Sequence, residues 1–106
     1  MSRWYDIGPL DDIAPESSVL LVSDEGRSIA VWRLADGRLS ATDDACTHFF
    51  SSLHEAGALV GMEITCPAHE ARFDVMTGAP LCLPARRPLT IYEVDVDAER
   101  NVHVRA

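Results

Sequence analysis

The sequence contains two short motifs that each combine a thiol with an imidazole. They are Cys46-Thr47-His48 and Cys66-Pro67-Ala68-His69. Thiolate sulfur and imidazole nitrogen are ligands of tetrahedral zinc and of [2Fe-2S] centres in which two histidines replace two cysteines on one iron. Each motif lies in a turn-rich stretch, and Pro67 stiffens the second one because its ring fixes the backbone. Two such loops can hold a metal centre between them.

The order of the residues within the motifs favours iron over zinc. Zinc sites usually group Cys with Cys and His with His, and the second pair often lies on a helix. Here each motif supplies one residue of each type, and no helical period is evident around them. This interleaving fits a diiron cluster in which one iron takes a cysteine from each loop and the other takes a histidine from each loop. A structural zinc domain used for protein binding is the alternative.

The elements that must position these loops are short strands. In residues 90–97, Tyr92, Val94 and Val96 alternate with acidic residues, which is the period of a half-buried strand. Other strand-like runs are separated by turn signals such as Asp36-Gly37 and Thr77-Gly78. These runs cover residues 19–22, 28–34, 38–42, 59–65, 72–75 and 102–104. At most one turn of helix is expected, over residues 51–55, so the pattern predicts an all-β sandwich or small barrel.

Composition narrows the class of protein. The chain has 106 residues, enough for one domain, with 47% hydrophobic and 25% charged residues. Three cysteines do not suggest a disulfide framework, and no signal peptide or membrane span is visible, so we expect a cytoplasmic protein. A formal net charge of −8, with no lysine, argues against binding to nucleic acid or to an anionic membrane.

The two motifs resemble the binding loops of Rieske iron-sulfur proteins. The likeness continues to the C-terminus from about residue 43, and the preceding residues match in strand pattern only. It is carried by Cys46-Thr47-His48, Cys66-Pro67-Ala68-His69, Phe73-Asp74, Thr77-Gly78, Pro84, Pro88-Leu89 and Tyr92. The short chain without a membrane anchor looks like the ferredoxin component of bacterial aromatic-ring-hydroxylating dioxygenase systems.

This resemblance implies an antiparallel β-sandwich with a small cluster-binding subdomain formed by two loops. The whole chain, residues 1–106, would form a single Rieske domain, with its cluster-binding portion at about residues 43–85. The resemblance further implies one [2Fe-2S] cluster per chain, with Cys46 and Cys66 on the inner iron and His48 and His69 on the outer iron.

The same resemblance implies a carrier of single electrons that is not itself an enzyme. Its partners would be a flavin-containing ferredoxin reductase, which supplies the electron, and a terminal Rieske oxygenase, which receives it. A small Rieske subunit of a reductase such as nitrite reductase is the alternative within this family.

The sequence differs from the respiratory-complex type of Rieske protein at several positions. That type has an extra cysteine in each loop, and here these positions are Ser51 and Ala68, so the corresponding disulfide cannot form. It also has hydroxyl residues that donate to sulfur, where this chain has Ala71 and Phe73. Phe50 replaces a common glycine of the first loop.

Residues outside the motifs are expected to have structural roles. We expect His54 to be an exposed loop residue, His103 to lie on a solvated strand face, and Cys82 to be a small buried side chain. Trp4 and Trp32 are expected in the core or at a sheet edge, and Arg72 in solvent. Phe49 and Phe50 are expected either to shield the cluster or to form a docking patch.

Overall fold

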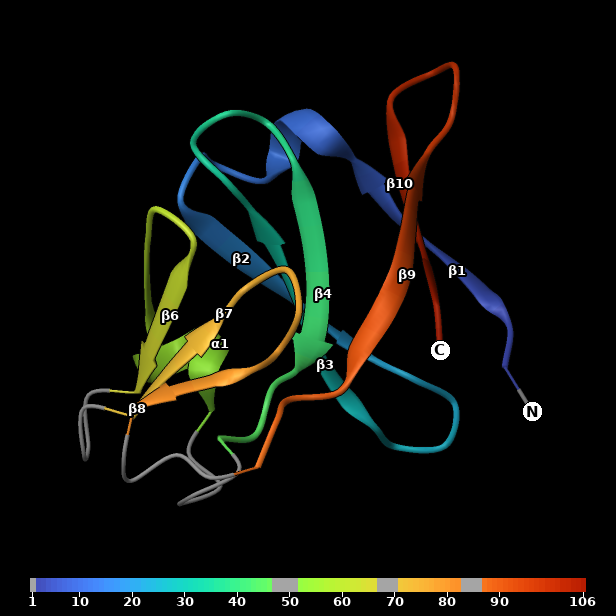
Figure 1. Cartoon of the computed structure of the whole chain (residues 1–106). Helices are drawn as coiled ribbons and strands as arrows, with labels where there is room; N and C mark the ends of the chain where they lie inside the picture. The colour runs from blue at the N-terminus through green and yellow to red at the C-terminus, as the bar shows by residue number, and fades with distance from the viewer. Residues whose placement is uncertain (1, 47–51, 67–70, 83–86) are drawn as a thin grey trace.

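Two antiparallel sheets make up most of the protein (Figure 1). The computed structural model describes residues 2–46, 52–66, 71–82 and 87–106. The larger sheet has the order β1-β10-β9-β4-β3-β2, with β1 at Trp4–Pro9, β2 at Ser17–Val22, β3 at Ser28–Arg33, β4 at Leu39–Asp43, β9 at Ile91–Val96 and β10 at Asn101–Arg105. The smaller sheet has the order β5-β6-β7-β8, with β5 at Ala58–Val60, β6 at Glu63–Cys66, β7 at Ala71–Asp74 and β8 at Pro80–Cys82.

Helical structure in the described residues is confined to two short pieces. A 3₁₀ turn, η1, spans Leu10–Asp12, and a single α-helical turn, α1, spans Leu53–Ala56. No helix in the described part of the chain has the length and hydropathy needed to cross a bilayer.

Strand β3 is buried on both faces, and this explains its nearly continuous apolar sequence, Ser-Ile-Ala-Val-Trp-Arg. Ile29 and Val31 point into a core formed with β4 and β10. Ala30 and Trp32 point the other way, into a second core shared with the smaller sheet. Successive strand residues alternate between faces, so one strand contributes to both cores.

The second core fixes the smaller sheet against the larger one. Trp32 packs there with Ile64 of β6 and Phe73 of β7, and none of the three is more than 2% exposed. Across the same boundary, the hydroxyl of Ser40 in β4 donates to the carbonyl of Val75 at 2.5 Å. The cluster-binding portion expected from the sequence is therefore built on a sheet of its own, in addition to two loops.

The two ends of the chain pair with each other. The amide of Arg3 donates to the carbonyl of Ala106 at 2.9 Å, and the amide of Ala106 donates back at 3.0 Å. In Figure 1 the N and C labels lie on the opposite side of the molecule from β6, β7 and β8.

Most of the predicted strands are confirmed, but four features differ. Residues 59–65 form two strands, β5 and β6, because the chain turns at Gly61-Met62. Strand β1 was not predicted, since Gly8-Pro9 resembles a turn signal, and β8 was missed because it has only three residues. The single helical turn falls at Leu53–Ala56, two residues later than expected.

Candidate metal centre

Cys46 lies at the base of the first loop. Strand β4 ends at Asp43, and an isolated antiparallel bridge between Ala45 and Ser52 joins the two sides of this loop. The side chain of Cys46 is 0% exposed. The bridge therefore holds one candidate ligand at a closed loop base, while residues 47–51 lie outside the described part of the chain.

Cys66 holds the equivalent position in the second loop. It is the last residue of β6, and it pairs with Ala71, the first residue of β7, so these two residues close the loop that contains His69. Ile64 pairs with Phe73 in the same ladder, and the buried residues of β6 and β7 alternate with partly or fully exposed ones. This alternation turns Cys66 toward the core, where it is 1% exposed.

Both thiols belong to one buried apolar cluster. Leu53, Ile64 and Phe73 are members of it, and all three are fully buried. Neither Cys46 nor Cys66 forms a disulfide. Cysteine sulfur is a common ligand of zinc and of iron-sulfur clusters, so two unbridged cysteines in one cluster are candidates for a metal site. The structure therefore places both predicted cysteine ligands in one cluster, and their binding of a metal stays a prediction.

His48 and His69, the two other predicted ligands, lie outside the described residues, as do Phe49 and Phe50. Within the described ranges, no group of three or more His, Cys, Asp or Glu side chains is gathered in a metal-binding arrangement. The assignment of the two histidines therefore stays a prediction.

The start of α1 is tied to the residues that precede the first loop. The amide of Leu53 donates to the carbonyl of Asp44, and the amide of His54 donates to its carboxylate Oδ1, both at 2.8 Å. Ser52 caps the same turn by accepting from the amide of Glu55 at 3.2 Å. The amides at the start of a helix have no partner within the helix, so these three bonds satisfy them.

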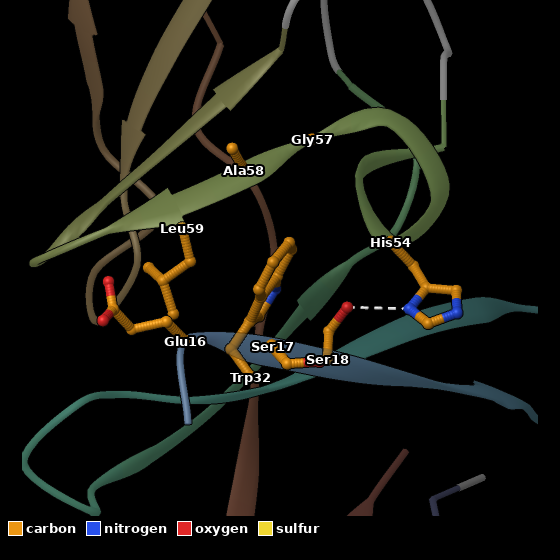
Figure 2. Close-up of a pocket in the computed structure, with 8 residues that line it drawn as sticks. All are labelled: Glu16, Ser17, Ser18, Trp32, His54, Gly57, Ala58 and Leu59. Carbon is orange, nitrogen blue, oxygen red and sulfur yellow. Dashed lines mark hydrogen bonds between the residues drawn. The ribbon is translucent and has the colours of Figure 1, made fainter. Parts of the chain in front are cut away.

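His54 differs from its sequence expectation. It is a partly buried residue of α1, and its ring Nδ1 lies 2.7 Å from the hydroxyl of Ser18 in β2 (Figure 2). This bond spans one end of a pocket of about 330 Å³ between β2 and the start of β5. The pocket is lined by Glu16, Ser17, Ser18, Trp32, His54, Gly57, Ala58 and Leu59. The bond joins α1 to β2 at the edge of the larger sheet.

A second polar network lies beside the first loop. The hydroxyl of Tyr92 donates to Oδ1 of Asp43 at 2.5 Å and accepts from Nη1 of Arg27 at 3.5 Å. Burial and then the bond to Asp43 raise the pKa of Tyr92 to about 12. The bond to Tyr92 raises the pKa of Arg27. Tyr92 was recognised by resemblance, but its long-range contact with Asp43 has no sequence signal.

Cys82 and Arg72 also differ from expectation. Cys82 is partly exposed, and its sulfur accepts from Nε of Arg72 at 3.4 Å. The same guanidinium donates to Glu63 at 3.3 Å through Nη1. Arg72 therefore links β6, β7 and β8 on the outer face of the smaller sheet, and Cys82 is not the buried side chain that the sequence predicted.

His103 and the two tryptophans occupy the places that the sequence predicted. His103 lies on the outer face of β10, where Nε2 is 2.8 Å from Oδ2 of Asp97, and this bond raises the pKa of His103. Trp32 is 2% exposed and Trp4 is 45% exposed, so they occupy the core and an edge strand respectively.

Comparison with known proteins identifies the group that such a pair of loops holds. Residues 3–93 match the Rieske [2Fe-2S] domain. The chain is 41% identical over 98 residues to a Ralstonia sp. protein named as the ferredoxin component of naphthalene 1,2-dioxygenase/salicylate 5-hydroxylase systems, covering 92% of this chain and 91% of that protein.

Solved structures agree in fold. A chain from a complex of reduced oxygenase and oxidised ferredoxin in carbazole 1,9a-dioxygenase superposes with a TM-score of 0.87 at 36% identity, covering 95% of this chain and 91% of that chain. A Mycobacterium tuberculosis structure, described as a putative NADH-dependent nitrite reductase small subunit, gives 0.87 at 20% identity, covering 100% and 96%. The match of residues 3–93 to the domain and the 41% identity over most of both chains establish that the chain belongs to the Rieske [2Fe-2S] domain family.

Proposed function

We propose that this protein carries single electrons from a flavin-containing reductase to the terminal oxygenase of an aromatic-ring-hydroxylating dioxygenase system. The observation that carries the proposal is the 41% identity, over nearly the full length of both chains, to the ferredoxin component of such a system. In this role the chain has no substrate site of its own and acts in the cytoplasm. The whole chain, residues 1–106, acts as one Rieske domain with its cluster portion at about residues 43–85.

In the proposed site, Cys46 and Cys66 bind one iron through their thiolates, and His48 and His69 bind the other through one ring nitrogen each. When bound, a [2Fe-2S] cluster takes up and releases one electron. The described residues supply two conditions for holding such a group. The two thiols sit at closed loop bases, and Leu53, Ile64 and Phe73 exclude water from beneath them.

The ligand assignment can be tested with variants matched to non-ligand residues of the same type. Cys46→Ser and Cys66→Ser should each abolish the visible absorption and the iron and acid-labile sulfide content, because serine removes the soft thiolate ligand. Cys82→Ser is the matched control, and it should retain two irons and two sulfides. Equal cluster content in all three variants would overturn the assignment of the cysteines.

The histidine ligands are tested by spectroscopy. The reduced wild type should give a [2Fe-2S] electron paramagnetic resonance signal with a low average g. His48→Cys or His69→Cys should lose this signature, whereas His103→Ala should keep it. A single bound zinc in place of iron, giving a colourless protein, would contradict the proposal as a whole.

The carrier role is tested by reconstitution. Oxygenase turnover with reductase present should require this protein, and its reduced form should be reoxidised by the oxygenase. Purification from its source in fixed stoichiometry with a large reductase chain would instead indicate a permanent subunit. The nitrite reductase small subunit shares the fold at only 20% identity, so this alternative has weaker support.

A further inference from the structure

The first loop leaves the larger sheet and returns to the protein at α1, and one side chain joins these two points. Asp44 follows the last residue of β4 and precedes Cys46 by two positions. Its amide donates to the carbonyl of Ser28 at 3.1 Å, which fixes Asp44 to the start of β3. Asp44 is 6% exposed, so its carboxylate is buried for a charged group.

On the return side, Asp44 accepts two hydrogen bonds from consecutive amides. Its carbonyl accepts from Leu53 and its Oδ1 accepts from His54, both at 2.8 Å. Both amides belong to the first turn of α1, where no partner within the helix is available. An oxygen acceptor is suited to this place because the first amides of a helical turn otherwise have no partner, and the side-chain oxygen of Asp or Asn can satisfy them.

Leu53 connects the hydrogen bonds of Asp44 to the two thiols. This side chain is fully buried in the apolar cluster that contains Cys46 and Cys66. Asp44 therefore holds the chain just before the first loop to the helical turn just after it. Through Leu53, it also holds that turn against the apolar cluster that contains both thiols. The adjacent bridge between Ala45 and Ser52 closes the same base but involves no side chain of Asp44.

We propose that Asp44 is a positioning residue for the cluster site, acting through the placement of its acceptor oxygens on α1 and not through its negative charge. The proposal rests on the proposed ligation by Cys46. If the base of the loop is held by this residue, the ligands on it stay preorganised, and a cluster is released slowly. If the hydrogen bonds are lost, α1 and the end of β4 move apart more often.

Three substitutions at one position separate geometry from charge. Asp44→Asn removes the charge but keeps an oxygen at the position of Oδ1 that accepts from His54. Asp44→Glu keeps the charge but moves the oxygens outward by one methylene. Asp44→Ala removes both. Glu55→Gln is the matched control, because it removes one carboxylate charge from an exposed residue of the same helical turn.

The measurements use the holoprotein. The half-life of the visible absorption after addition of an iron chelator reports cluster release, and the electron paramagnetic resonance g-values report the ligand geometry. We expect Asp44→Ala and Asp44→Glu to shorten the half-life by about tenfold or more, the scale of leaving a buried amide without its hydrogen-bond partner, and to shift the g-values. Asp44→Asn and Glu55→Gln should stay within about threefold of the wild type and keep its g-values.

The opposite ranking, with Asp44→Glu like the wild type and Asp44→Asn like Asp44→Ala, would overturn the proposal in favour of a charge effect. Wild-type behaviour in all three variants would overturn it as well, and so would loss of the cluster in Asp44→Asn. If Asp44→Ala does not fold, Asn and Glu still decide between geometry and charge. A wild type without a [2Fe-2S] cluster would be a failure of the proposed function, which is a separate result.

Discussion

Around the two buried thiols, the side chains of β7 that face the core have no hydroxyl group. Ala71 and Phe73 are both 0% exposed and belong to the same apolar cluster as Cys46 and Cys66. Rieske centres span roughly −150 to +300 mV, and hydrogen bonds to the sulfurs are one of the factors that set the value. A hydrogen-bond donor stabilises the more negative reduced state, so side chains without donors favour a low potential.

We therefore expect a reduction potential near the low end of that range, about −150 mV. Voltammetry should show a rise in Ala71→Ser combined with Phe73→Tyr, provided that iron content is unchanged. Val60→Ser is the control, because Val60 is 68% exposed and lies at the far end of the β5–β6 hairpin from Cys66. A wild-type potential well above zero would contradict the dioxygenase-type assignment. No rise in an intact double variant would contradict the role of hydroxyl donors.

Tyr92 gives a second prediction at the scale of one residue. Its pKa is raised from 10.0 to about 12, so the protonated phenol is favoured in the folded state. Its contribution to stability is complete below pH 10 and is lost as the pH rises toward 12. In a difference titration of wild type against Tyr92→Phe, the phenolate absorption of Tyr92 should emerge near pH 12. An ionisation at the ordinary pKa of a tyrosine would show that the bond to Asp43 and the burial do not hold in solution.

Elements were predictable where local pattern alone decides them. The alternation in β9 and the Asp36-Gly37 turn between β3 and β4 both identified hairpin strands correctly. The sequence pattern did not predict the strands whose pairing depends on residues that are distant in the chain. Strand β1 forms because it pairs with β10 at the other end of the chain, and β8 exists because it completes a ladder with β7.

The candidate site was likewise predictable from the sequence only in part. Residue type and spacing predicted Cys46 and Cys66 as ligands, and the structure places both buried at loop bases, while their binding of a metal stays a prediction. The contact of Asp44 with α1 and that of Ser18 with His54 join segments that are remote in sequence. Neither contact has a periodicity or a motif, so only the folded chain reveals it.

Gly78 gives a prediction at the scale of elements. Its backbone φ is +76°, and an added Cβ would lie 2.2 Å from the carbonyl oxygen of Leu89. The amide of Leu89 donates to the carbonyl of Gly78, so the two backbone segments are held close together. Gly26 has a similar φ of +82° with nothing within 4 Å of an added Cβ. Gly26→Ala should cost about 1 kcal/mol in backbone strain. Gly78→Ala should cost about 3 kcal/mol, because the backbone of residue 89 must also move.

The two variants are compared by thermal unfolding of the holoprotein at one scan rate. For a domain of this size, 1 kcal/mol corresponds to roughly 4–8 °C in Tm. The drop in Gly78→Ala should therefore exceed the drop in Gly26→Ala by a factor of two or more. Equal drops would mean that the close approach to residue 89 does not constrain the fold.

At the scale of the whole molecule, negative charge dominates. The formal net charge is −8, and several of the arginines are already paired with carboxylates, as in Arg3 with Asp24 and Arg100 with Asp11. These exposed pairs contribute little to stability. Because the carboxylates outnumber the arginines, a surplus of carboxylates stays unpaired with arginine, and a partner meets a negatively charged protein.

This surplus predicts that the reaction with the oxygenase depends on salt. Electrostatic steering onto a basic partner acts over the Debye length, which falls from about 30 Å at 0.01 M to about 3 Å at 1 M ionic strength. The second-order rate constant should therefore fall by about tenfold or more across that range in stopped-flow measurements. A rate constant independent of salt would indicate apolar docking, for which Phe49 and Phe50 are the sequence candidates.

The pairing of the two chain ends has a practical consequence for attaching the protein to other objects. Residues 3 and 106 are hydrogen-bonded to each other on the side of the molecule away from the smaller sheet. A tag, a fused domain or a linker to an electrode placed at either end would therefore leave from nearly the same point. Tethering at either terminus would place the smaller sheet on the side of the molecule away from the support.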